Sequence, residues 1–174
     1  MILRLIERVS GASGVIAAWL IVPLIFATVY EVISRYVFNA PTIWAYEVGY
    51  LATGSSFLVG MAYALREGAH IRIDAISMNM SAKRRAVIDL VLYGVFLIPF
   101  VVWLTHMLYT RALDAFESGE RSGQSAWNPP LWPFRTIFFI AFALLLIQIV
   151  AEIIKCVRVL SGHETSPVRV SGAR

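Results

Sequence analysis

The sequence predicts an all-α membrane protein with four transmembrane helices, from its composition, its four long apolar runs and the distribution of its basic residues. Of its 174 residues, 59% are hydrophobic and only 15% are charged, and the mean hydropathy is +0.72. An average soluble domain carries roughly 25% charged residues, so the composition excludes an ordinary water-soluble globule, and its high hydrophobicity excludes an intrinsically disordered chain. Helices are the expected spanning form, because lipid offers no hydrogen-bond partner to free backbone groups.

Four runs each supply the roughly 20 apolar residues that a helix needs to cross the hydrocarbon core. We place the spans at about residues 11–33, 44–65, 86–110 and 134–155, in one transmembrane domain of residues 1–160. The first run is longer than the apolar part of a secretory signal, so we expect it to be a retained helix. Residues 161–174 are predicted to form a disordered cytoplasmic tail.

The basic residues predict that both termini lie in the cytoplasm. Four spans put the two termini on one side, and an excess of Lys and Arg marks the cytoplasmic side. Eleven of them lie in the terminal segments and the second loop, against four on the opposite side. The net charge of +4 is therefore explained by topology. The basic residues are scattered along the chain and do not indicate nucleic-acid binding.

The second loop predicts a short amphipathic helix at the cytoplasmic surface, between the second and third spans. Its apolar residues recur at helical spacing: Ala69, Ile73, Ile76 and Met80. His70 and Asp74 lie four residues apart on it, either as a solvated pair or as a latch against a partner. Ser81 is a candidate N-cap for the third span. Headgroup contacts are predicted for basic and aromatic residues near the membrane surfaces: Lys83, Arg84, Arg85, Trp44, Trp127 and Trp132.

Three charged residues lie near the outer ends of the first two spans. Glu31 and Arg35 have the i, i+4 spacing of a helix ion pair, and Glu47 lies in the first turn of the second span, where the helix dipole favours an anion. We expect structural ion pairing among these three, with ion or proton handling as the alternative. No charged residue lies at mid-depth in a span, as a carrier's own site would require. His106 is the only histidine in a span, so bis-histidine haem ligation is not expected.

A stripe of small residues runs along one face of the second span. It consists of Gly49, Thr53, Ser56, Gly60 and Ala64. Small residues let helix backbones approach closely in lipid, so this face is expected to meet another helix. That helix is either the chain's own fourth span or part of a different subunit.

Four segments carry a family resemblance that extends over most of residues 1–158. They are Glu31–Asn39, Trp44–Glu47, Phe57–Gly60 and, most specific of all, Ala64–Asp74. With them the chain resembles the small membrane subunit of tripartite ATP-independent periplasmic (TRAP) transporters. It departs from the pattern at Tyr46, which precedes Glu47 where many relatives have two consecutive acids.

The resemblance implies a non-catalytic subunit of the bacterial inner membrane, without a cofactor of its own. In such a symport system a periplasmic binding protein delivers a small carboxylate-type solute, and a large membrane subunit imports it with a sodium gradient, binding the sodium itself. The small subunit braces the large one through the small-residue stripe or the opposite face of the same helix. The resemblance also implies that a cytoplasmic motif of Arg66, His70, Arg72 and Asp74 stabilises the inner side, and that the loops around 35–44 and 114–132 help to receive the binding protein.

Two other classes stay open at this point. One is a self-sufficient proton-coupled exporter that uses Glu31 or Glu47, and the other is the membrane anchor of a redox complex.

Overall fold

A computed structural model describes residues 2–68 and 81–162 of the chain, and these residues are predominantly helical. Within this part, four helical runs are long and apolar enough to cross a membrane: Leu3–Tyr36, Ala45–Arg66, Lys83–Glu117 and Trp132–Leu160. The all-α class and the presence of four helical runs long and apolar enough to span a membrane are thus confirmed, and three of the runs extend beyond the predicted span limits. The predicted amphipathic helix and nearly all of the predicted tail lie outside the described residues.

Prolines interrupt two of the long runs without ending them. The first run consists of α1 (Ile2–Trp19) and α2 (Ile21–Tyr36), which meet at Leu20. Pro23 lacks the N–H that would bond the carbonyl of Trp19, so the helix is perturbed one turn before the proline. In the third run, the π-helical turn η1 (Leu92–Leu97) separates α5 (Ala82–Val91) from α6 (Ile98–Glu117), immediately before Pro99.

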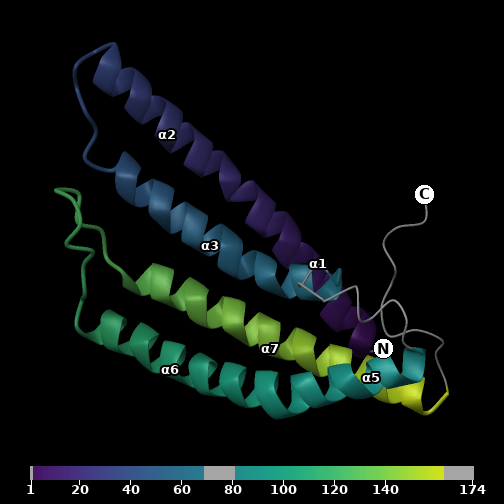
Figure 1. Cartoon of the computed structure of the whole chain (residues 1–174). Helices are drawn as coiled ribbons and strands as arrows, with labels where there is room; N and C mark the ends of the chain where they lie inside the picture. Colours follow the sequence, from purple (N-terminus) through teal and green to yellow (C-terminus); the bar gives the residue numbers. More distant parts are fainter. Residues whose placement is uncertain (1, 69–80, 163–174) are drawn as a thin grey trace.

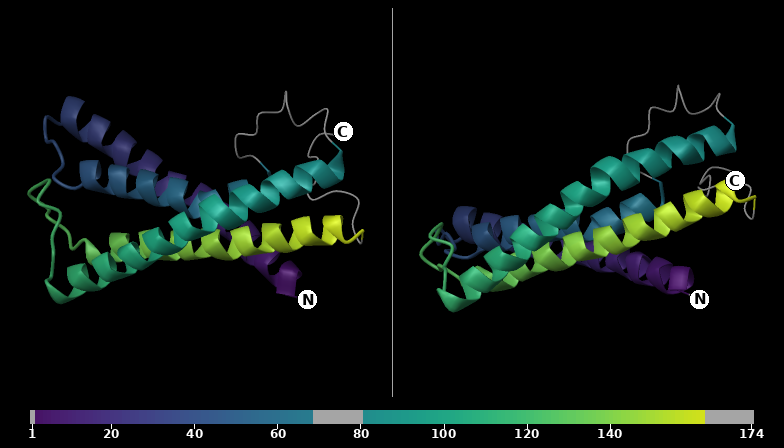
Figure 2. Two further views of the ribbon diagram at one scale, coloured as in Figure 1. Left: turned by 60° about the horizontal axis from the view of Figure 1, so that its bottom comes forward. Right: turned by 90° about the horizontal axis from the view of Figure 1, so that it is seen from below.

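The helices lie side by side in an open row, in the order α2, α3 (Ala45–Arg66), α7 (Trp132–Leu160) and α6. Figure 1 shows this order from top to bottom, and Figure 2 shows α5 beside the C-terminal part of α7. The end of the row that carries residues 37–44 and 118–131 is called the loop end below. The N-terminus and the C-terminal end of α7 lie at the opposite, terminal end.

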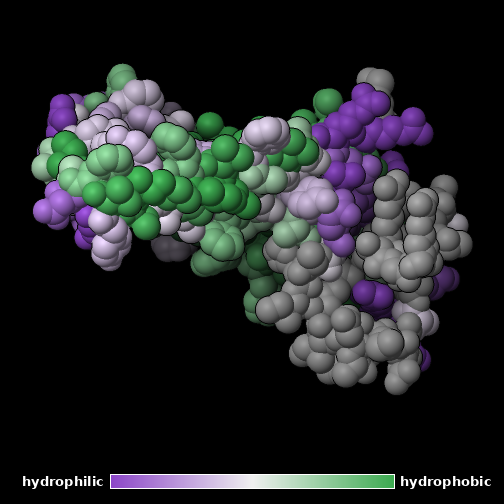
Figure 3. Space-filling view, turned by 90° about the horizontal axis from the view of Figure 1, so that it is seen from above, coloured by the Kyte–Doolittle hydropathy of each residue, from purple (hydrophilic) through white to green (hydrophobic). Residues whose placement is uncertain are grey.

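A row of helices buries little of its surface, and the small residues of α3 make its packing possible. Ala62 of α3 is completely buried, and Val59 of α3 packs in one cluster with Ala17 of α1 and Ala141 of α7. A second cluster joins Leu65, Val101, Leu145 and Ile149 across α3, α6 and α7. Large apolar side chains cover the outside, and Figure 3 shows them as a green band between purple ends. This distribution fits a chain whose middle lies in lipid.

Polar side chains join α1 to α7 near the terminal end. The Ser10 hydroxyl donates to Gln148 Oε1 at 2.6 Å, and Gln148 Nε2 donates to Glu152 Oε1 at 2.7 Å. Lys155 Nζ lies 2.8 Å from Glu152 Oε1 and 3.2 Å from Glu7 Oε1. Gln148 is completely buried, so this network satisfies polar groups that would otherwise be costly in an apolar environment.

Replacing Gln148 by Ala should destabilise the fold, because both the Ser10 hydroxyl and a Glu152 oxygen would lose a buried partner. We expect the free energy of unfolding to fall by about 1–3 kcal/mol, measured by steric trapping or thermal unfolding in detergent. The control is Gln124→Ala, since Gln124 is an exposed residue of the loop end. Equal stability of the Gln148 variant and the wild type would contradict the structural role of the network.

Candidate functional site

The small-residue stripe of α3 faces the first helix of the same chain. A Cβ on Gly60 would lie 3.5 Å from the Cβ of Ala17, and one on Gly49 would lie 3.7 Å from a methyl carbon of Leu24. The Ser56 hydroxyl donates to the Ala17 carbonyl at 2.8 Å. The prediction that this face meets a helix is therefore right, and at these positions that helix belongs to the first run rather than to the fourth span. Contact of the stripe with another subunit stays a prediction.

The other two members of the stripe, Thr53 and Ala64, are half-buried. Thr53 donates to the Gly49 carbonyl of its own helix at 2.8 Å, and Ala64 lies near the terminal end of α3. The opposite face of α3 is occupied as well, because Leu65 and Gly54 pack against α7 and its neighbours. Both faces of α3 thus take part in packing within the chain, and their contact with a large subunit stays a prediction.

Glu31 holds the loop between α2 and α3. Its Oε1 accepts a hydrogen bond from Arg35 Nε at 2.8 Å and forms an ion pair with the same guanidinium, so the predicted Glu31–Arg35 pair is present. Its Oε2 accepts from the Thr42 backbone N–H at 2.8 Å and from the Thr42 hydroxyl. Together these bonds fix the end of α2 to the start of α3, across the turn at Asn39, whose φ is 52°.

Glu47 does not join this cluster as predicted. It is completely buried in the first turn of α3, and its Oε1 accepts a hydrogen bond from the Ser125 hydroxyl rather than from Arg35. Its Oε2 has no hydrogen-bond partner among the described residues. The carboxylate therefore connects α3 to the distant loop of residues 118–131.

That loop is ordered by its own hydrogen bonds. Arg121 and Pro130 form an antiparallel bridge, and the backbone of Ser122 donates to the carbonyl of Pro129 at 3.0 Å. Arg135 Nη2 lies 2.5 Å from Glu120 Oε1, which joins the loop to α7. The helix before the loop ends at Glu117, two residues before Gly119, whose φ of 64° suits glycine. The loop end is consequently a defined surface rather than a pair of loose connections.

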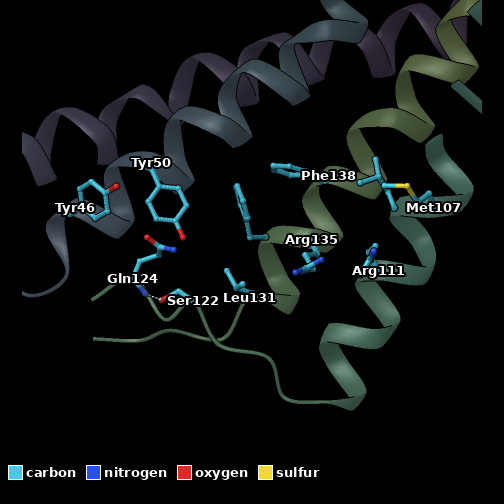
Figure 4. A pocket seen from close by; sticks show the side chains of 11 residues that line it. Tyr46, Tyr50, Met107, Arg111, Ser122, Gln124, Leu131, Arg135 and Phe138 are labelled. Atoms are coloured by element: carbon cyan, nitrogen blue, oxygen red, sulfur yellow. Dashed lines mark hydrogen bonds between the residues drawn. The ribbon is translucent and has the colours of Figure 1, made fainter. Parts of the chain in front are cut away.

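A cleft of about 650 Å³ opens at the loop end between α3 and the α6–α7 pair. Figure 4 shows Tyr46 and Tyr50 on the α3 side and Arg111, Arg135 and Phe138 on the other. Tyr50 packs edge-on against Phe134, with ring centroids 6.1 Å apart. Sequence analysis did not find this cleft, because its lining comes from three helices and a loop.

The predicted headgroup residues are placed near the two ends of the row. Lys83 and Arg84 are exposed at the terminal end, whereas Arg85 is half-buried with its Nε inside the protein. Trp44 packs on Tyr30, Trp132 packs edge-on against Phe116, and Trp127 is 41% exposed. Contact of these residues with lipid headgroups stays a prediction.

Of the predicted cytoplasmic motif, the structure describes Arg66 alone. Its guanidinium lies across Gly11, where an added Cβ would come within 2.5 Å of Arg66 Nη1, and its Nε lies 3.7 Å from Glu67 Oε1. His70, Arg72 and Asp74 lie outside the described residues. Arg66 therefore takes part in the α1–α3 crossing.

Sequence analysis missed the buried network of Gln148 and Glu152. A signal was present, because Gln148, Glu152 and Lys155 fall at i, i+4 and i+7 on an otherwise apolar helix. No group of three or more His, Cys, Asp or Glu residues that could hold a metal ion occurs in residues 2–68 and 81–162.

The chain is similar to a known family over most of its length. The family model described as "Tripartite ATP-independent periplasmic transporters, DctQ component" matches residues 24–159. No curated protein matches the chain. The matched region runs from within α2 to the end of α7 and so includes both loops of the loop end and the cleft there.

Replacing Glu31 by Gln should loosen the loop of residues 37–44, because the ion pair with Arg35 is lost and the bonds to Thr42 lose their charge. We expect hydrogen exchange of this loop to rise by roughly tenfold, as for the loss of about 1.4 kcal/mol of local stability. The control is Glu117→Gln, an exposed carboxylate at the end of α6. Unchanged exchange in the Glu31 variant would show that the clamp does not hold the loop.

Proposed function

The chain belongs to the DctQ family, the small membrane component of TRAP transporters, and on this premise we propose that it braces the large membrane subunit of such a transporter. The large subunit would import a small carboxylate-type solute that a periplasmic binding protein delivers. It would draw on a sodium gradient and bind the sodium itself, so that this chain needs no cofactor. The family is one of transporter components rather than of enzymes.

The observation that carries the proposal is the open row of helices. A pathway for a solute needs walls on every side, whereas α2 and α6 form the two edges of the row and do not pack against each other. Along the most apolar 18-residue stretch of the third run, only 6% of the residues are buried inside the protein. A helix arrangement with so much unpaired surface is suited to lining another membrane protein.

The edge helix α2 offers the most distinct surface for that subunit. A concavity of about 440 Å³ runs along it, lined by apolar side chains at helical spacing: Val22, Ile25, Phe26, Val29, Tyr30 and Ile33. The stripe of α3, which the resemblance suggested for this contact, is covered by α1 and α2. We therefore assign the contact to the outer face of α2, where a partner helix could pack into the groove.

The ordered loop end supports a second contact, with the periplasmic binding protein. A surface that is already fixed before binding loses little conformational entropy on association. The clamp at Glu31 and the bond between Glu47 and Ser125 hold the two loops in this way. The loop end would then face the periplasm, and both termini would lie in the cytoplasm of a bacterium with an inner membrane.

The structure favours bracing over the exporter alternative. In the described residues, Glu31 is engaged by Arg35 and Thr42, and Glu47 is covered by the loop of residues 118–131. Both acids thus have structural partners at the loop end. No observation favours the redox-anchor alternative.

Replacing Phe26 by Ala should weaken association with the large subunit. An aromatic side chain in an interface contributes on the order of 1.4 kcal/mol or more, so we expect roughly tenfold less large subunit to co-purify. Trp103→Ala is the matched control, because Trp103 on α6 is 62% exposed and Phe26 is 63% exposed. Equal co-purification of both variants with the large subunit would reject α2 as the contact, and loss with Trp103→Ala alone would transfer it to α6.

Cysteine labelling can test the orientation cleanly, because the chain has one cysteine, Cys156, and it is buried. We expect Ala126→Cys, in the exposed part of the 118–131 loop, to react with a membrane-impermeant maleimide in spheroplasts. Lys83→Cys, at the terminal end, should react only after permeabilisation. The reverse pattern would overturn the proposed topology, and the wild type serves as the unlabelled control.

A further inference from the structure

The cleft at the loop end has the size of a small-molecule binding site. Its volume of about 650 Å³ lies within the range of roughly 300–1,000 Å³ that is typical of small-molecule sites. Its walls are α3 on one side and α6 with α7 on the other (Figure 4). These three elements belong to runs that are long and apolar enough to span a membrane, and the loop of residues 118–131 supplies the rest of the lining.

The polarity of the lining changes with distance from the loop end. Ser122 and Gln124 come from the loop itself, and Arg135 lies in the first turn of α7. Met107 lies one helical turn, about 6 Å, farther from the loop end than Arg111, and Phe138 lies about 4.5 Å farther than Arg135. Leu131 and Phe134 also line the cleft near the loop end, so the mouth combines polar and apolar side chains, whereas Met107 and Phe138 make the part farther from the loop end apolar.

Arg111 supplies the available positive charge. Arg135 is already paired with Glu120, at 2.5 Å, whereas the described part of the chain gives Arg111 no ion pair or hydrogen bond. Glu47 is not part of the cleft lining, and its carboxylate is covered by Ser125. A guanidinium binds a phosphate through two parallel hydrogen bonds, and the hydroxyls of Tyr46 and Tyr50 are suited to the headgroup level.

We propose that this cleft binds one glycerophospholipid, with its phosphate on Arg111 and an acyl chain along Met107 and Phe138. An extended peptide segment of a partner would match the polar groups at the mouth but would leave its own backbone groups unpaired against the apolar inner part. An acyl chain carries no such groups. A phospholipid also surrounds every membrane-spanning helix, so this ligand is available wherever the protein is.

Native mass spectrometry of the full chain, alone and with its large subunit, tests the proposal. The purified protein is delipidated and then exposed to mixed micelles that contain phosphatidylglycerol. We expect the wild type to retain one lipid, and Arg111→Gln to retain about tenfold less, as for the loss of a charge-assisted contact. Arg111→Lys should restore most of the binding, and Leu108→Trp should block it by filling the inner part of the cleft.

The control is Arg84→Gln, which removes an equal charge from an exposed residue at the terminal end and should leave retention unchanged. Equal retention by the wild type, Arg111→Gln and Leu108→Trp would overturn the proposal. So would a photoreactive residue at Met107 that cross-links to the large subunit instead of to lipid. If the Arg111→Gln variant does not fold, full lipid retention by a folded Leu108→Trp variant is enough by itself to overturn the proposal. Because the chain is also measured by itself, the outcome does not depend on the bracing function.

Discussion

Close backbone approach around α3 is the contact on which the rest of the row depends. Between transmembrane helices there is no hydrophobic driving force, and association relies on van der Waals packing at short range. Gly60 brings α3 against Ala17, and Gly54 brings it against Phe134, where an added Cβ would lie 3.2 Å from the ring. On α1, Gly14 leaves room for the ring of Tyr63. With larger residues at these positions α3 would lose both neighbours, and the two edge helices would have nothing to connect them.

Polar contacts act differently at the two ends of the row. At the terminal end they join helix to helix, through Ser10, Gln148 and Glu152. At the loop end the carboxylates of Glu31 and Glu47 instead join helices to loops. The terminal end is therefore closed by buried bonds, whereas the loop end keeps α3 apart from α6 and leaves the cleft open between them.

The sequence predicts the number and class of the helices well, because apolar runs of this length have few alternatives in lipid. It predicts the Glu31–Arg35 pair for a related reason, since an i, i+4 contact depends on local geometry alone. The contacts between residues that are far apart in the sequence depend instead on how the helices are placed in three dimensions. Glu47 meets Ser125, which lies 78 residues away, and the stripe of α3 meets α1 and α2 rather than α7. Periodicity shows which residues share a helix face, but it carries no information about which helix covers that face.

The π-helical turn before Pro99 affects how the third run packs along α7. Such a turn holds one residue more than an α-helical turn, which rotates the faces on its two sides by about 100° relative to each other. Ala86 of α5 packs with Cys156 and Val159, and Val101 of α6 packs with Leu145 and Ile149, so both halves address α7. The extra residue thus rotates α5 relative to α6 so that the packing faces of both point toward α7. Deleting one residue from 92–97 would leave one half facing α7 and turn the other half's packing side toward the surroundings.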